Sequence, residues 1–235
     1  MTAPTGSLMQ PEILTDSLVP AGHADLLFDQ FPHYEAGMTW LNEFVTQPHP
    51  DLGRPGAVCP RLAPAIRANT VWLVTVTVHA AQPEDAVAAG GILMELFAEL
   101  PTGTHRATTA LLGFFPDLPA ADAANFIDVG HRLLRPEFAS AGLMLGEFHP
   151  ASTVGGVHNR NLPVMRCPVP MYAIRTMTPH DLLFAAQPAT PPADRVAYLE
   201  QLGRHVGSRL SPAVRDQLRA RLTTAREALN SGQLL

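Results

Sequence analysis

The segment VWLVTVTVH, residues 71–79, carries the strongest β-strand signal in the chain. Its residues are mainly β-branched or aromatic, and these types fit the pleated surface of a sheet best. The pattern predicts a strand that lies centrally and is largely buried. The rest of the fold is expected to build outward from this strand.

Helical and strand patterns alternate on either side of that segment. Apolar residues recur at helical spacing in several stretches, and short runs of strand-forming residues lie between them. The expected helices cover residues 34–46, 83–100 and 122–134, and the further strands cover residues 106–115, 143–148 and 168–177. Beyond Pro192 the chain is expected to be helical. Together these elements predict an α/β fold with a central sheet of about four strands, flanking helices and a helical C-terminus.

The length of 235 residues fits one domain, since domains usually run from about 50 to 250 residues. The first 20 residues combine scattered polar residues with turn formers, namely Pro4, Gly6, Pro11 and Pro20. Such a composition is typical of a poorly ordered chain end. We therefore expect a flexible tail over residues 1–20 and a single α/β domain over residues 21–235.

All 16 cationic side chains other than histidine are arginine, and the chain contains no lysine. Schiff-base enzymes, pyridoxal-phosphate enzymes and phosphate-loop NTPases each depend on a lysine amine, so the composition excludes these three classes. The net charge of −5 also argues against binding to a phosphate backbone. We expect a small-molecule substrate and no nucleic-acid partner.

The N-terminal residues lack the basic start and the unbroken apolar run of a signal peptide. No stretch of about 18 apolar residues is free of charge and proline, so no membrane partner is expected. Two cysteines, Cys59 and Cys167, are expected to be free thiols in a reducing compartment. These features predict a cytoplasmic protein.

Candidate chemistry concentrates in the stretch GLMLGEFHPASTVGGVHNRNLPVMRCPVPMYAIR, residues 142–175. A strand ending at Phe148 delivers Glu147 and His149 to its carboxyl end, where open α/β sheets place their ligands. Because these two residues are two apart, their side chains are expected to point to the same face. Glu147 is a candidate for holding a cationic substrate or relaying protons, with a strand-end salt bridge to an arginine as the alternative. His149 is either a metal, haem or acid–base residue, or a structural histidine at the strand end.

Three arginines, Arg160, Arg166 and Arg175, fall within sixteen residues of this stretch. Arginine suits the carboxylates of a bound ligand, although the same side chains also pair with acidic residues of the fold. The Gly155–Gly156 pair allows the loop to approach a ligand closely. Both interpretations stay open on the sequence alone.

A second candidate segment is HPDLGRPGAVCP, residues 49–60. It predicts a long loop rich in proline and glycine, and long loops inside compact domains are often functional. Cys59 followed by Pro60 is a dipeptide that occurs where a thiolate binds haem iron. A buried structural cysteine is the alternative.

Common catalytic templates are missing from the sequence. It contains no HExxH, CxxC or GxSxG motif, and no GxGxxG after a predicted strand. Serine hydrolases, zinc metalloproteases and dinucleotide-fold oxidoreductases therefore lose their usual sequence support. His131 and His205 lie in helical patterns and are expected to be surface or interhelix residues.

The two candidate segments together resemble a domain of unknown function found mainly in actinobacteria, often near natural-product genes. The resemblance covers residues 40–184 and rests on HPDLGRPGAVCP early and on GEFHP, HN and RCPVPMYAIR late. More distantly, the layout is similar to the YqcI/YcgG family, which includes haem proteins that hydroxylate guanidine nitrogens. That similarity implies that Cys59 takes the place of an early family cysteine. It also implies that residues 149–152 take the place of a late His-Pro-x-Ser element.

The resemblance implies one haem b between the residue 49–60 loop and the residue 146–166 loop. We expect His149 rather than Cys59 as the axial ligand, since haem iron takes either residue type. The haem propionates would be held by Arg160, Arg166 and Arg175. The expected reaction is oxygenation of a nitrogen-containing small molecule, an amino acid or a guanidine, in natural-product metabolism. An external electron donor is then required, because no flavin or nicotinamide motif is visible.

A non-haem iron site is the first alternative. Glu147, His149 and His158 supply two histidines and one carboxylate, the set that suits Fe(II) with open positions for oxygen and substrate. All three residues are ligands in this alternative. Across the hypotheses taken together, Glu147 and His158 are the candidate catalytic residues, and His149 is the candidate metal ligand. This alternative predicts a metal-dependent oxidase or oxygenase.

The second alternative is a protein that binds a ligand or partner without turnover. The C-terminal helical region carries an apolar stripe at a spacing near 3.6 residues, formed by Leu199, Leu202, Val214, Leu218, Leu222 and Leu229. This stripe must be buried, either on the chain's own sheet or against a second subunit. Two-fold dimers are the commonest closed assembly, and we expect a homodimer.

Overall fold

The structure is a computed structural model, and it describes residues 10–101, 107–186 and 190–232. Five strands form one mixed sheet in the order β1-β2-β3-β5-β4. Their bounds are β1 Glu12–Pro20, β2 Val71–Thr77, β3 Ala110–Phe114, β4 Leu143–Phe148 and β5 Met171–Thr176. Strands β2 and β3 are parallel, while all other neighbours are antiparallel. The predicted α/β class is confirmed, with five strands where about four were expected.

Strand β1 corrects the prediction of a flexible tail over residues 1–20. It pairs with β2 from Glu12 to Pro20, and the register shifts between Leu14 and Val19. Within this bulge the Ser17 hydroxyl accepts a hydrogen bond from the Thr75 amide at 2.8 Å. A side chain thus replaces a ladder bond that the bulge interrupts. Residues 1–9, the remainder of the predicted tail, lie outside the described part of the chain.

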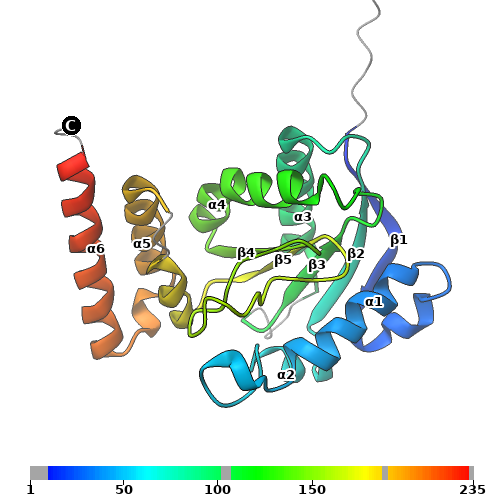
Figure 1. Ribbon diagram of the computed structural model, residues 1–235, viewed down its shortest axis with the longest axis horizontal. Coiled ribbons are helices and arrows are strands. Elements are labelled where there is room, and N and C mark those ends of the chain that lie inside the picture. Colours follow the sequence, from blue (N-terminus) through cyan, green and yellow to red (C-terminus); the bar gives the residue numbers. More distant parts are fainter. Residues whose placement is uncertain (1–9, 102–106, 187–189, 233–235) are drawn as a thin grey trace, which may run out of the picture.

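Helices cover both faces of the sheet (Figure 1). Helices α3 (Pro83–Glu99) and α4 (Gly130–Ser140) lie on one face, and α1 (Pro32–Trp40) and α2 (Leu62–Arg67) lie toward the other. A π-helical turn, η2 (Leu41–Val45), continues α1. The short helices are η1 (Ala21–Leu27), η3 (Pro50–Leu52), η5 (Asn125–Val129), η6 (Pro179–Ala186) and η7 (Gly207–Arg209).

Each face of the sheet has its own hydrophobic core. The core under α3 and α4 contains Leu93, Phe126 and Tyr172, whereas the core under α1 contains Tyr34 and Phe114. Side chains of β2, β3 and β5 enter both cores, because successive residues of a strand point to opposite faces. The sheet is therefore buried on both sides at its interior strands. The strand expected over residues 71–79 is the buried interior strand β2, which lies second in the order beside the edge strand β1.

The last two helices form a hairpin beside the β4 edge of the sheet (Figure 1). Helices α5 (Pro192–Val206) and α6 (Pro212–Gly232) pack on each other and, together with η6, enclose a third core. Leu199, Leu202 and Leu218 are buried in it. The predicted apolar stripe is thus largely covered within the chain.

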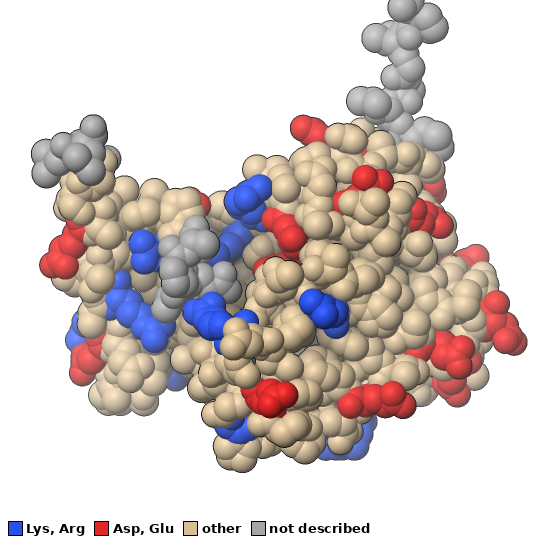
Figure 2. Space-filling view, in the orientation of Figure 1, with Lys and Arg blue, Asp and Glu red and all other residues tan. Residues whose placement is uncertain are grey.

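Charged side chains are spread unevenly over the surface. On the face in Figure 2, most arginines lie left of centre near the C-terminal helices, while acidic residues dominate the right-hand side of the same view. Among the described residues, no helix combines the length and the apolar character that crossing a membrane requires.

Candidate functional site

A π-helical turn brings two polar side chains of the α4 region toward the end of β4. The turn η5 leads directly into α4 and contains Asp128, and His131 follows one turn later. Single π-helical turns are rare and occur frequently at functional sites. Asp128 and His131 lie three residues apart, so they occupy the same side of this helical segment.

His131 binds strand β4 through one nitrogen. Its Nε2 lies 2.8 Å from the Glu147 carboxylate and 3.1 Å from the Leu145 carbonyl oxygen. Both partners are acceptors, so Nε2 carries the proton and donates to them. The two side chains are only 16% and 14% exposed. This partly buried pair of a histidine and a carboxylate connects α4 to β4.

His149 forms a second pair directly beyond the strand. Its Nε2 donates to Asp128 Oδ1 at 3.1 Å, and its side chain is 1% exposed, whereas that of Asp128 is 45% exposed. The other ring nitrogen, Nδ1, is buried and makes no hydrogen bond within the described part of the chain. The buried His149 therefore holds one oxygen of the Asp128 carboxylate, while the Asp128 side chain is accessible to solvent.

We call Asp128, His131, Glu147 and His149 the histidine–carboxylate cluster. Burial raises the pKa of Asp128 above its ordinary value, and the charge of Glu147 raises that pKa further. His149 and His131 oppose this shift by favouring the ionised carboxylate. The cluster thus joins two carboxylates of like charge to two imidazoles, the environment in which proton-transfer residues are tuned.

Tyr172 of β5 lies beneath the cluster. Its hydroxyl donates to the carbonyl oxygens of Phe126 and Ile127, at 3.2 and 3.1 Å, inside the π-helical turn. Burial raises the pKa of Tyr172, and the charges of Glu147 and Asp128 add to that effect. The phenol therefore stays protonated and fixes the turn that carries Asp128.

The sequence placed Glu147 and His149 correctly on one face, since both reach the η5–α4 segment. Glu147 pairs with a histidine, so the alternative of a strand-end salt bridge to an arginine is wrong. The sequence also missed Asp128 and treated His131 as a surface or interhelix residue. The three-residue spacing of Asp128 and His131 places both on one side of a helix, and this spacing is the sequence pattern that would have indicated a shared site.

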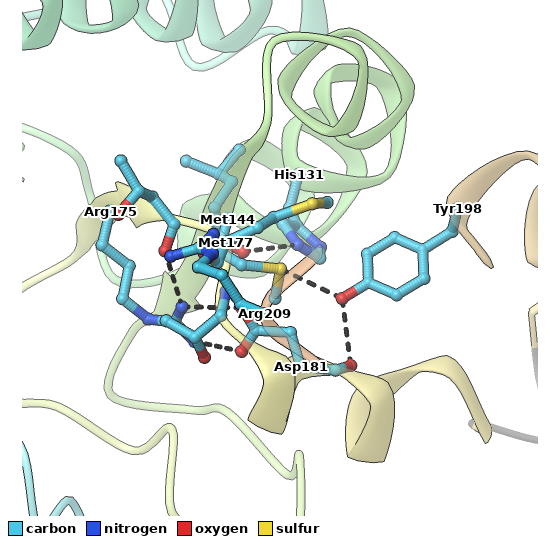
Figure 3. Close-up of polar contacts among 10 residues, drawn as sticks. His131, Met144, Arg175, Met177, Asp181, Tyr198 and Arg209 are labelled. Carbon is cyan, nitrogen blue, oxygen red and sulfur yellow. Dashed lines mark hydrogen bonds and ion pairs between the residues drawn. The ribbon is translucent and has the colours of Figure 1, made fainter. Parts of the chain in front are cut away.

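Arg175 serves the fold and is not directed at a ligand. It forms a two-pronged ion pair with the fully buried Asp181, at 2.6 and 2.8 Å. The Thr178 amide donates to the Asp181 carboxylate at 2.7 Å. The Tyr198 hydroxyl donates to the Asp181 carbonyl oxygen at 3.1 Å (Figure 3). This contact ties β5 to η6 and α5, and it removes Arg175 from the candidate propionate ligands.

Arg160 and Arg166 both have exposed side chains, and the backbone of Arg166 forms a parallel bridge with that of His149. Arg166 donates from Nε to the Ser152 carbonyl at 3.3 Å. Arg160 lines a hollow of about 30 Å³ together with Gly155 and Gly156. That hollow has room for about one or two water molecules.

The two candidate loops contact each other directly. Asn159 donates from its side-chain amide to the Asp51 carbonyl at 2.7 Å, and a side chain on Gly53 would meet the His158 carbonyl at 3.1 Å. His158 itself is exposed. Cys59 is half-buried against the core under α1 and is a free thiol.

The predicted iron ligands Glu147, His149 and His158 are not brought together. Within the described ranges, no group of three or more histidine, cysteine, aspartate or glutamate residues is placed to hold a metal ion. The non-haem iron set is therefore wrong as proposed, because Glu147 is engaged by His131 and His158 belongs to the exposed loop contact.

The fold and the cluster define an α/β protein with a partly buried histidine–carboxylate site at one end of its sheet. The chain belongs to the family described as domain of unknown function DUF6875, which matches residues 34–213. The match includes every member of the cluster. Comparisons with curated proteins and with solved structures give no match.

Proposed function

We propose that the protein is an enzyme that removes a proton from a cationic nitrogen group of a small molecule at Asp128. One observation carries the proposal: Asp128 is the solvent-facing member of the cluster, and burial together with Glu147 raises its pKa. A carboxylate with a raised pKa is a better proton acceptor near neutral pH. An amino acid or a guanidine supplies the nitrogen group.

The geometry gives each residue a role. Asp128 Oδ1 is held by His149, so Oδ2 is directed to the substrate and receives the proton. The N–H bond breaks, its electron pair stays on the substrate nitrogen as a lone pair, and any later oxidation or transfer at nitrogen requires that lone pair. His149 is a positioning residue, since its proton stays on Nε2 throughout. Glu147 keeps the pKa of Asp128 high, and His131 holds Glu147 in place.

The site is suited to a cationic substrate because it holds two carboxylates and no arginine contacts them among the described ion pairs. Burial removes part of the hydration that stabilises the ionised Asp128 carboxylate. The attraction of a nearby cation compensates for part of that loss.

Turnover of an amino-acid and guanidine panel, followed by mass spectrometry, tests this function. With a substrate in hand, Asp128→Asn is expected to lower kcat/KM by about 10²–10⁴-fold, because the proton acceptor is lost. His158→Gln, which removes an exposed imidazole of the other loop, is the matched control and keeps wild-type activity. Full activity of Asp128→Asn contradicts the proposal.

Haem-dependent oxygenation is a second candidate, and it rests on the resemblance to the YqcI/YcgG proteins. The buried, unpartnered Nδ1 of His149 favours it, since imidazole is a haem ligand. The surrounding contacts oppose it: Nε2 is taken by Asp128, Arg175 is paired with Asp181, and the hollow at Arg160 is far smaller than a haem. The described residues therefore do not fit a haem in this conformation.

Titration of the protein with hemin separates the two candidates. A Soret band that appears in the wild type and is lost in His149→Ala supports haem binding and an external electron donor. Absence of the band after expression with haem supply and after titration removes this candidate, while the acid–base proposal stands.

A cytoplasmic homodimer completes the proposal. The small charged fraction of 16% favours association, although the leucine stripe is already used between α5 and α6. Light scattering at micromolar concentration tests it, and a mass near 25.3 kDa rules out a stable dimer.

A further inference from the structure

A groove on α1 lies on the opposite face of the sheet from the histidine–carboxylate cluster. It has a volume of about 450 Å³ and is lined by Pro32, Glu35, Ala36, Thr39, Trp40 and Pro168. The groove is shallow and largely open to solvent, and its volume falls within the range of small-molecule sites, about 300–1,000 Å³. Its chemistry is independent of the proposed function.

One side of α1 builds the floor of the groove. Pro32, Ala36 and Trp40 are spaced by four residues, so they share one side of the helix. Ala36 is small and leaves space between the proline ring and the indole. Pro168, just before β5, forms the opposite wall.

Neighbouring aromatic rings hold the Trp40 indole in position. Its ring centroid lies 5.6 Å from that of Phe148, edge to face, and 6.1 Å from that of Phe44. The indole is half-buried, and its nitrogen donates no hydrogen bond within the described residues. An aromatic face that is fixed by packing is ready to bind a ligand without loss of side-chain entropy.

The charge of the groove selects a cation. Glu35 is its only charged lining residue; it is exposed and makes no ion pair within the described part of the chain. No arginine is among the lining residues, and the chain has no lysine to fill the site from within. An indole face beside a carboxylate attracts ammonium groups, and quaternary ammonium recognition by aromatic side chains is the best-known use of that attraction.

We propose that this groove binds a small organic ammonium compound, with the cation between the Trp40 indole and the Glu35 carboxylate. The two prolines supply apolar walls for the methyl groups of such a ligand. An anionic ligand is disfavoured by Glu35, and a neutral one gains only apolar contact.

The two tryptophans allow a direct test, because Trp72 lies on β2, and its substitution leaves Trp40 as the sole reporter. Choline is the probe, and 3,3-dimethyl-1-butanol is its uncharged isostere. In full-length Trp72→Phe we expect choline to change Trp40 emission with saturation and a dissociation constant on the order of 1 mM. The alcohol is expected to bind at least about tenfold more weakly.

Glu35→Gln keeps the shape of the groove and removes its charge. We expect it to weaken choline binding about three- to tenfold and to leave the alcohol unaffected. In Trp40→Phe, choline binding measured by saturation-transfer NMR falls, and Trp72 emission does not respond. Equal affinity for both compounds, unsaturable quenching, or unchanged binding in Glu35→Gln overturns the proposal. Because all readouts are of binding, failure here is distinct from failure of the acid–base function.

Discussion

Each face of the sheet buries a histidine within a polar network, but the two networks differ in chemistry. Under α1, His33 contacts hydroxyl groups; at the η5–α4 face, His149 and His131 contact carboxylates. We call His33 and its partners Tyr34, Thr75 and Ser17 the hydroxyl network.

The hydroxyl network is a chain of hydrogen bonds in which each member donates to the next. His33 Nε2 donates to Thr75 at 2.8 Å, the Thr75 hydroxyl to Tyr34 at 3.0 Å, and the Tyr34 hydroxyl to the Ser17 carbonyl at 2.8 Å. The histidine–carboxylate cluster instead contains two like charges and an unpartnered nitrogen. A satisfied neutral network is expected to stabilise the fold, whereas an unsatisfied charged one is typical of a functional site.

The largest expected effect is on stability, from Tyr34→Phe. It leaves the buried Ser17 carbonyl without its donor and the Thr75 hydroxyl without its acceptor, at a cost of about 2–3 kcal/mol in the free energy of unfolding. Urea denaturation measures this loss, and Tyr34→Phe combined with Thr75→Val is expected to cost less than the sum of the single changes. A loss below about 0.5 kcal/mol would show that the network does not stabilise the fold.

The next effect is a pH dependence set by His33. Burial lowers its pKa from 6.5 to about 4, against the opposing charge of Asp117. The unfolded chain therefore takes up this proton more readily, and stability present above pH 6.5 is lost as the pH falls toward 4. We expect a loss of about 1–2 kcal/mol, reduced by partial exposure.

His33→Gln removes this titration and keeps a donor for Thr75, so it flattens the stability profile between pH 6.5 and 4. Chemical denaturation at several pH values measures the slope. His180→Gln controls for the loss of one exposed imidazole. A slope that His33→Gln leaves unchanged excludes His33 as its source.

Strands were predicted correctly from the sequence where a segment consists mainly of apolar or β-forming residues. Residues 143–148 were predicted as a strand with the bounds of β4, and the apolar segment from residue 71 forms β2, an interior strand beside the edge strand β1. Strand β1 was missed because it is an edge strand that contains Asp16 and Ser17, follows Pro11 and ends at Pro20. Its pairing depends on β2, and a local pattern does not contain that information.

The site was predicted only in part for a similar reason. Glu147 and His149 follow from strand periodicity, which is local. Asp128 and His131 join them because η5 is π-helical, and Arg175 leaves the set because Asp181 approaches it from a later segment. These contacts join residues of different elements, so the periodicity of a single element and the spacing of motifs do not predict them.

Asp128→Asn is expected to have a smaller effect on stability than either change in the hydroxyl network. Because burial raises the pKa of Asp128 in the folded chain, stability that is present below its ordinary value of 3.8 is lost as the pH rises through the raised pKa. Asparagine stays neutral and still accepts from His149. At pH 7 we expect the free energy of unfolding to stay level or rise, by less than about 1 kcal/mol given the exposure of Asp128. A loss above about 2 kcal/mol would falsify the distinction between the two networks.

The smallest effect is expected from Glu147→Gln, and it tests the coupling within the cluster. The charge of Glu147 raises the pKa of Asp128, so its removal lowers that pKa, while glutamine keeps an oxygen for His131. Carboxyl-carbon NMR titration measures the shift, and Glu137→Gln, an exposed change on α4, leaves it unchanged. With a substrate, the acidic limb of the kcat/KM profile should move to lower pH in Glu147→Gln by the same amount, because that limb reports the proton acceptor of the free enzyme. A titration shift without movement of the limb would keep the electrostatic coupling but assign the proton transfer to a residue other than Asp128.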